Sequence, residues 1–372
     1  MKILVLTNEF EDESFGGAAT AATGIAHMLE QVGVEQTVVV PRSDWQEARW
    51  LGQSPRLRIL GLPRNPRYFG HLGMIKTEVL REQFPELWQN WDLIHIQAIN
   101  FTPLAYALAQ ERIPLLYSVY SFLREELGNR QEAAMQAQFK IQEELLARCQ
   151  GIHLISQSQR SYLVGYFPEL LAKTAVLPLG IHRPIERWQQ KNSNRFLYLG
   201  RLLDYKGIED LIRAVERGGR SRRQLHLDIV GKGTDAYVKY LKSLVLTMKL
   251  ESNIQFHGWR PTPEVKQWMT QAAALVIPSR REAFGLVALE GMAVGTPLIV
   301  SRAGGLRELV NEEYALTFEP GNIRQLAEAL VIALNNPARC QQFSAKGCER
   351  ALGFEWSRLA PEYVALLERV KT

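Results

Sequence analysis

The chain has 372 residues, enough for about two domains that each bury a core. Its 46% hydrophobic and 22% charged residues are typical of a soluble globular protein, and no stretch reaches the roughly 18 to 20 apolar residues that span a bilayer. The net charge of +5 is modest, and the three cysteines form no CxxC pair, which speaks against a disulfide framework or a zinc site.

Short apolar runs alternate with helical stretches through the first half of the chain. Strands are predicted at 2–7, 36–41, 92–97, 114–120, 151–156 and 174–178, and helices at 18–31, 103–110 and 131–148. This β-α-β rhythm predicts a parallel, doubly wound sheet. The first strand begins directly at the N-terminus with no cleavage-site pattern, so we expect a cytoplasmic protein.

The rhythm pauses in the polar segment 182–194 and then starts again. Strands are predicted at 195–201, 224–230, 254–257, 274–278 and 297–300, and helices at 208–217 and 236–249. We therefore expect two Rossmann-like α/β domains, 1–182 and 183–354, facing across a cleft that holds the ligands. The amphipathic segment 355–372 is expected to form a helix that crosses back to the first domain.

One segment of the second domain, 278–297, indicates a ligand site. Glu282 and Glu290 stand eight positions apart across a predicted loop-to-helix junction, with Phe284, Gly285 and Leu286 between them. Backbone amides at a helix start attract an anion, and neighbouring carboxylates suit hydroxyl groups. A sugar nucleotide meets both demands.

A basic motif lies at the end of the strand predicted at 195–201. Gly200 allows a tight turn, and Arg201 and Lys206 leave the strand end together. Arginine and lysine both bind phosphate, so this pair is expected to neutralise a diphosphate leaving group. Two surface bases beside a turn would be the alternative if the motif stood alone.

Further glycines end predicted strands. Gly231 and Gly258 lie where a nucleotide base would approach the backbone, and the loop Ser14–Gly17 carries Gly16 and Gly17 before the first helix. Ordinary turn punctuation is the alternative for each of them.

Two basic clusters stand out. The first comprises Arg56, Arg58, Arg64 and Arg67 and alternates with Leu57, Leu60, Leu62, Tyr68 and Phe69, which suits peripheral contact with an anionic membrane surface or a charged acceptor. The second comprises Arg217, Arg220, Arg222 and Arg223 and is interpreted as solvated surface. No nucleic-acid-binding motif accompanies the charge.

Taken in order, these motifs resemble those of the GT-B fold retaining glycosyltransferases of family 4 (glycosyl transferases group 1), over nearly the whole chain. The resemblance includes Gly16-Gly17, 92–96, 176–182, Gly200-Arg201, Lys206-Gly207, 230–233, 256–258, the Glu-x7-Glu segment, 304–308 and the Phe-x-Trp start of the last helix. It implies transfer of a sugar from a nucleoside diphosphate sugar, with UDP- and GDP-sugars favoured, to a hydroxyl acceptor that is a glycan, a lipid-linked sugar or a small molecule. It also implies that no metal or other cofactor is needed.

The resemblance assigns roles to matching positions. Glu290 would accept hydrogen bonds from the ribose, and Glu282 would lie near the transferred sugar. The amides of Phe284, Gly285 and Leu286 would hold sugar hydroxyls and phosphate, Arg201 and Lys206 would stabilise the departing diphosphate, and Trp259 and Arg260 would border the base.

One departure concerns the stretch 116–122. Many members of the family carry Thr-x-His-Asp there, but Tyr120 stands in place of the histidine and Ser121 in place of the aspartate. Tyr120 is a candidate for the acceptor side of the site, with a core aromatic as the alternative, and His95 is a second acceptor-side candidate. The leading function is a hexosyltransferase; a sugar-nucleotide epimerase, and a sugar-nucleotide-binding protein that has lost transfer, are the alternatives.

Overall fold

The structure, a computed structural model, describes residues 1–11, 16–52, 54–110, 112–128, 132–184, 187–189, 194–218 and 225–372. Ser14 of the glycine loop and Arg220, Arg222 and Arg223 of the second basic cluster lie outside this part. The chain divides into two compact units: Met1–Gly180 with Trp356–Thr372, and Ile181–Glu355. The sequence-based boundaries were placed after His182 and Phe354.

The first unit is built on an eight-stranded sheet in the order β3-β4-β2-β1-β5-β6-β7-β8. Its strands are β1 (Lys2–Leu6), β2 (Glu35–Arg42), β3 (Arg49–Gly52), β4 (Leu57–Pro63), β5 (Leu93–Ile96), β6 (Leu115–Val119), β7 (Gly151–Leu154) and β8 (Thr174–Val176). All neighbours pair in parallel except β3, which runs antiparallel to β4 at the edge. Strands covered on both faces are expected to be apolar throughout, and β2 and β5 are buried along nearly all of their length.

Helices connect these strands. They are α1 (Gly17–Gln31), α2 (Thr77–Gln83), α3 (Thr102–Ala109), α4 (Leu123–Leu127), α5 (Ala133–Arg148) and α6 (Gln157–Tyr166). The order of the strands reverses between β1 and β5, so the segments that follow these two strands diverge at the carboxyl edge of the sheet. Ligands of such sheets bind at this kind of position.

The strands β3 and β4 were not predicted, and they correct the interpretation of the first basic cluster. Leu57, Leu60 and Leu62 are fully buried in β4, and Tyr68 is almost fully buried. These side chains form core and are not available to a membrane surface. The short edge strand and its interleaved arginines obscured the alternation that marks a strand.

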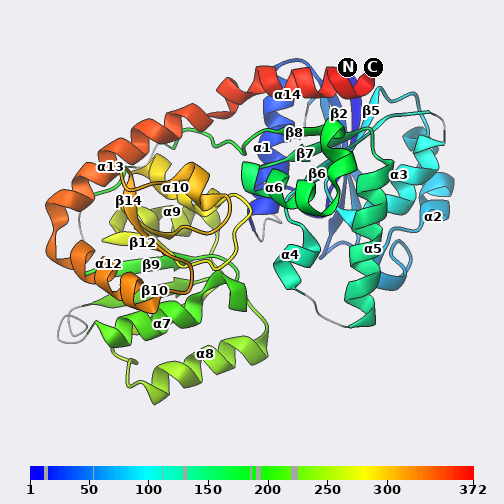
Figure 1. Ribbon diagram of the computed structural model, residues 1–372. Helices are drawn as coiled ribbons and strands as arrows, with labels where there is room; N and C mark the ends of the chain where they lie inside the picture. Colours follow the sequence, from blue (N-terminus) through cyan, green and yellow to red (C-terminus); the bar gives the residue numbers. More distant parts are fainter. Residues whose placement is uncertain are drawn as a thin grey trace. The chain divides into compact units, whose positions relative to one another are not determined.

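The last helix, α14 (Trp356–Lys371), belongs to the first unit, which confirms the prediction from its apolar stripe. It contacts α1, β5 and β6 (Figure 1). A Cβ on Gly24 of α1 would lie 2.4 Å from the Trp356 ring, so the glycine makes room for the tryptophan. At the end of α14, Lys371 pairs with Asp92 at 3.0 Å, and Asp92 also accepts a hydrogen bond from the backbone of Lys2 at 2.7 Å. One carboxylate therefore ties both ends of the chain to the sheet.

The second unit contains a six-stranded parallel sheet in the order β11-β10-β9-β12-β13-β14. Its strands are β9 (Arg195–Leu199), β10 (His226–Val230), β11 (Ile254–Gly258), β12 (Ala274–Ile277), β13 (Leu298–Ser301) and β14 (Ala315–Phe318). Its helices are α7 (Ile208–Arg217), α8 (Asp235–Thr247), α9 (Thr262–Gln271), α10 (Leu286–Val294), α11 (Leu306–Leu309), α12 (Ile323–Asn335) and α13 (Pro337–Ala351). The strand order reverses between β9 and β12, the two strands that precede the basic and acidic motifs.

Each unit thus contains one of the two α/β sheets that the GT-B fold predicts. Among the described residues, no helix combines the length and the hydrophobicity needed to cross a bilayer.

Candidate functional site

The candidate site of the second unit lies at the carboxyl ends of β9 and β12. Lys206, in the turn after β9, places its Nζ 2.9 Å from Oε2 of Glu282, which follows β12. Ser279 donates to the same oxygen at 3.1 Å. Both charged side chains are 17% exposed, so the pair is largely shielded from water yet remains reachable. The fold therefore joins the predicted basic and acidic motifs in one polar cluster.

Backbone geometry fixes the lysine beside the glutamate. Gly207 follows Lys206 with a φ of 71°, and a Cβ there would lie 2.0 Å from the carbonyl oxygen of Pro278. The turn after β9 thus packs directly against the end of β12, which requires glycine. On the other side, the Ser301 hydroxyl donates to the Ser279 carbonyl at 2.5 Å and links β13 to the same loop.

Arg201 lies at the surface of the same turn. Its guanidinium donates to the hydroxyl of Tyr205 at 3.1 Å, while its own carbonyl accepts a hydrogen bond from Tyr198 at 2.8 Å. The Tyr205 ring also lies under Lys206 and Arg281, at 5.4 Å from each cationic group to the ring centroid. Three cations are gathered around one buried tyrosine, which gives this edge of the sheet a positive potential suited to phosphate.

The start of α10 supplies backbone donors. Gly285 precedes the helix with a φ of 101°, and a Cβ there would lie 2.3 Å from the side chain of Leu306. Within the described part of the chain, no hydrogen bond is found from the backbone N–H of Phe284, Gly285 or Leu286. The first amides of a helix lack intrahelical acceptors and carry partial positive charge, so these three groups suit hydroxyl or phosphate oxygens.

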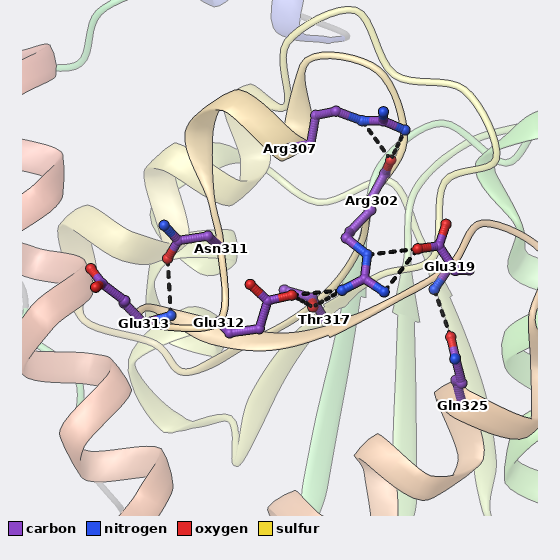
Figure 2. A network of polar contacts seen from close by, with 8 residues as sticks. All are labelled: Arg302, Arg307, Asn311, Glu312, Glu313, Thr317, Glu319 and Gln325. Atoms are coloured by element: carbon purple, nitrogen blue, oxygen red, sulfur yellow. Dashed lines mark hydrogen bonds and ion pairs between the residues drawn. The ribbon is translucent and has the colours of Figure 1, made fainter.

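A surface network holds the loop that supports this helix start. Arg302, directly after β13, donates to Glu312 at 2.6 Å, Glu319 at 2.8 Å and Thr317 at 3.0 Å. Its carbonyl accepts a hydrogen bond from Arg307 at 2.8 Å, and Figure 2 shows how the guanidinium lies between the two carboxylates. Three residues further on, Gly305 donates its N–H to the Glu282 carbonyl at 3.0 Å. The network therefore anchors the loop that contacts the backbone of Glu282.

Glu290 lies on α10 and is partly buried. Burial raises the pKa of its carboxyl to about 7, although nearby Lys266 on α9 lowers it. No hydrogen-bond partner of this carboxyl is found among the described residues. A desolvated carboxyl without a partner favours a ligand that brings its own donors, as a pair of ribose hydroxyls does.

The remaining predicted donor residues follow β10 and β11. Gly231 donates its N–H to the Gly258 carbonyl at 2.9 Å, so the two turns lie side by side. Trp259 is 47% exposed, and Arg260 pairs weakly with Glu264 at 3.9 Å. These positions leave an exposed indole beside two glycine turns, and their role in binding a base stays a prediction.

The candidates of the first unit lie at the carboxyl edge of its sheet. Gly16 precedes α1, which begins at Gly17. Tyr120 follows β6; its hydroxyl is buried without a hydrogen-bond partner among the described residues, and burial raises its pKa. An unpaired buried hydroxyl is costly, so Tyr120 differs from an ordinary core aromatic in having an unmet polar demand.

His95 is 2% exposed and sits inside a buried polar chain. Its Nε2 lies 2.7 Å from the Ser118 hydroxyl, which in turn lies 2.8 Å from Nδ1 of His153. Burial lowers the pKa of His95 to about 3, with His153 adding to the effect, so the ring is neutral. Its acceptor-side role stays a prediction, and this geometry favours an indirect one through Ser118 and the strand that carries Tyr120.

Sequence reasoning missed several residues that shape these sites. Asp210 on α7 accepts two hydrogen bonds from Arg280, at 2.7 and 2.6 Å, and so ties the loop after β12 to α7. Ser279 donates a hydrogen bond to Glu282, and the amide oxygen of Gln97, after β5, is buried and has no hydrogen-bond partner within the part of the chain that the structure describes. An aspartate within the apolar face of α7 is the signal that the sequence offers for Asp210, whereas Ser279 and Gln97 match no motif.

Comparison with known proteins covers both units. Residues 16–180 match the family model described as "Glycosyl transferase 4-like domain", and residues 183–350 match "Glycosyl transferases group 1". The chain belongs to the family 4 glycosyltransferases.

Two similar sequences are a glycogen synthase and a D-inositol 3-phosphate glycosyltransferase. A glycogen synthase of Mycobacterium tuberculosis is 29% identical over 279 residues, which are 72% of this chain and 66% of the relative. A D-inositol 3-phosphate glycosyltransferase of Thermobispora bispora is 27% identical over 328 residues, 80% of this chain and 75% of the relative. The chain thus spans just under two thirds of the glycogen synthase.

Solved structures establish the fold of this glycosyltransferase. A sucrose-phosphate synthase from Thermosynechococcus elongatus superposes with a TM-score of 0.81 at 22% identity and covers 99% of this chain and 98% of its own. Anabaena HepE in complex with UDP and glucose superposes with a TM-score of 0.78 at 19% identity, covering 99% of both chains. These similarities show the GT-B fold.

Proposed function

We propose that this protein transfers a hexosyl group from a nucleoside diphosphate sugar to a hydroxyl acceptor, with retention of configuration and without a metal ion. The acceptor oxygen forms a bond to the anomeric carbon, the bond from that carbon to the donor phosphate breaks, and the acceptor proton passes to the departing phosphate. The nucleoside diphosphate leaves with the charge that develops in the transition state.

One observation carries the proposal: Lys206, Glu282 and the free amides of α10 lie at the reversal point of a parallel sheet, with Arg201 on the same turn as the lysine. In this assignment Lys206 and Arg201 stabilise the departing diphosphate, and Glu282 orients the transferred sugar. Preorganised charge of this kind is usually the largest contribution to catalysis, because the donors need no rearrangement during the reaction.

The donor nucleotide is proposed to bind along the second unit. Glu290 would accept hydrogen bonds from the ribose, and Gly231, Gly258, Trp259 and Arg260 would border the base. UDP is the first nucleotide to test because Anabaena HepE, of the same fold, is described with UDP and with UDP-glucose. GDP is the second.

The acceptor side is assigned to the first unit, around Tyr120 and His95. Gly16 and Gly17, at the start of α1, are assigned to the donor, because their backbone amides would face a phosphate. A tyrosine donates one hydrogen bond and stays neutral at physiological pH, so it can orient a hydroxyl without taking its proton. We place the reaction in the cytoplasm.

A panel of UDP- and GDP-sugars, incubated with glycan, lipid-linked and small-molecule acceptors, tests the function by following nucleotide release and product mass. Product with the same anomeric configuration as the donor is the expected result, and its rate should not change on addition of EDTA. An isomerised sugar nucleotide would instead identify an epimerase. Tight nucleotide binding without product from any pair would identify a binding protein that has lost transfer.

A further inference from the structure

A ladder of aromatic rings runs outward from the core of the first unit. Phe122 is buried and stacks on Tyr162, with ring centroids 4.7 Å apart and planes 30° apart. The Tyr162 ring in turn contacts the Tyr166 ring in a tilted arrangement, with centroids 4.6 Å apart and planes 32° apart. Tyr166, at the end of α6, is 62% exposed. The ladder therefore ends in a tyrosine face that is held in place by its neighbours and presented to solvent.

Charged side chains border this face. A hollow of about 510 Å³ is lined by Tyr162, Tyr166 and Phe167 together with Arg124, Glu125 and Glu143. Arg124 pairs with Glu143 at 2.9 Å, and both are more than a third exposed. The hollow has the size of a small-molecule site and combines a flat apolar wall with donors and acceptors at its rim.

We propose that this hollow, the aromatic ladder pocket, binds a pyranose unit of a neutral oligosaccharide. One face of a pyranose ring is lined by C–H groups and stacks on an aromatic ring, while the hydroxyls at its edge both donate and accept hydrogen bonds. Arg124 supplies donors and the two glutamates supply acceptors, so each part of the sugar has a matching group.

Other ligands fit less well. One arginine faces two glutamates, so the pocket carries a net negative charge and repels phosphates, nucleic acid and an anionic membrane surface. A quaternary ammonium group needs rings arranged around it, whereas Phe122, Tyr162 and Tyr166 follow one another in a row.

The position of the pocket links it to transfer. Phe122, the innermost ring of the ladder, stands two residues after Tyr120, and Arg124 is the second residue of α4. The residues that would bind the glycan are thus near Tyr120, the proposed acceptor-side residue, in the sequence. This link rests on the proposed function, and the binding of sugar does not.

Isothermal titration with maltohexaose, cellohexaose and chitohexaose tests the binding. We expect at least one of them to bind, Tyr166→Ala to weaken it about tenfold, and Tyr166→Phe to retain it, since the ring and not the hydroxyl stacks. Tyr240→Ala is the matched control: Tyr240 is also an exposed tyrosine, 44% accessible and stacked on Tyr237 at 6.0 Å, but lies on α8 of the other unit. Thermal unfolding of each variant checks that it is folded.

Absence of binding by all three sugars overturns the proposal, as does binding that Tyr166→Ala leaves unchanged. Binding to anionic vesicles that falls in Tyr166→Ala would assign the ladder to a membrane instead. The transfer assay separates the two proposals. Sugar binding without transfer to any acceptor would refute the proposed function alone, and transfer with no sugar binding at the ladder would refute the pocket alone.

Discussion

Replacing Lys206 by alanine isolates the charge at the centre of the candidate site. The lysine Nζ lies 2.9 Å from the Glu282 carboxylate, and both side chains are 17% exposed. A fully buried pair costs about 3 to 5 kcal/mol when one partner is removed, and an exposed pair costs about 0 to 1 kcal/mol. Ser279 still donates to Glu282 in the variant. We therefore expect the free energy of unfolding to fall by about 1 to 2 kcal/mol.

The effect on transfer should be larger than the effect on stability. Loss of one preorganised donor to a developing negative charge typically lowers kcat about 10²- to 10³-fold, which is about 2.7 to 4 kcal/mol of transition-state stabilisation. Because that charge is smaller in the bound donor than in the transition state, KM should change by less than kcat.

Single-turnover rates and nucleotide titrations of Lys206→Ala measure the two effects separately. Lys239→Ala is a matched control, since Lys239 is an exposed lysine of α8 that belongs to none of the motifs assigned to the site. A Lys206→Ala variant that is folded and keeps the wild-type single-turnover rate would refute the reasoning. So would a variant that loses only affinity, because the lysine would then bind ground state and transition state equally.

Four further results are expected. Glu290→Ala should weaken nucleotide binding about tenfold by loss of the hydroxyl acceptor, measured by titration with UDP and GDP. Burial raises the pKa of Glu290 from 4.5 to about 7, so the buried carboxylate lowers the free energy of unfolding as pH rises through this window. In urea unfolding, Glu290→Gln should therefore be more stable than wild type at pH 8, by at most about 3 kcal/mol, and equal to it below pH about 4.5. Asp92 has a lowered pKa because the Lys2 backbone and Lys371 bind its carboxylate. Its contribution to stability is present above its ordinary pKa and is lost as pH falls through the lowered value. Asp92→Asn should therefore lower the free energy of unfolding by up to about 1 kcal/mol at neutral pH and not at all in strong acid. Arg302→Gln should cost about 1 kcal/mol at most, since the network is exposed, yet lower kcat several-fold through the loop at Gly305; an unchanged kcat would show that the network does not position Glu282.

The site of the second unit was more predictable than that of the first. Glu282, Glu290, Arg201 and Lys206 lie in motifs whose order along the chain is specific, and the switch between β9 and β12 follows from parallel topology. Ser279 and the pair of Arg280 with Asp210 match no motif, because one hydroxyl or one ion pair between distant segments leaves no periodic signal.

In the first unit, the basic cluster around Arg58 led to the wrong environment for its leucines. The segment of β4 contains arginine, glycine and proline and so has the local composition of a loop, and only pairing of β4 with β2 and β3 makes it a strand in which Leu57, Leu60 and Leu62 are buried. The aromatic ladder was likewise hidden. Tyr162 and Tyr166 share a helix face at i and i+4, but Phe122 comes from another element and completes the stack only in the folded unit.

The sequence by itself determined the two α/β units, the glycosyltransferase family and the residue types at the donor motifs, because apolar periodicity and ordered motifs are local properties of the chain. The tertiary structure decided which groups meet: Lys206 and Glu282 are 76 residues apart and become neighbours only because β9 and β12 pair in one sheet. It also decided the electrostatics, since the pKa of Glu290 depends on burial by residues from other segments. Contact and desolvation are properties of the packed fold, and no local pattern encodes them.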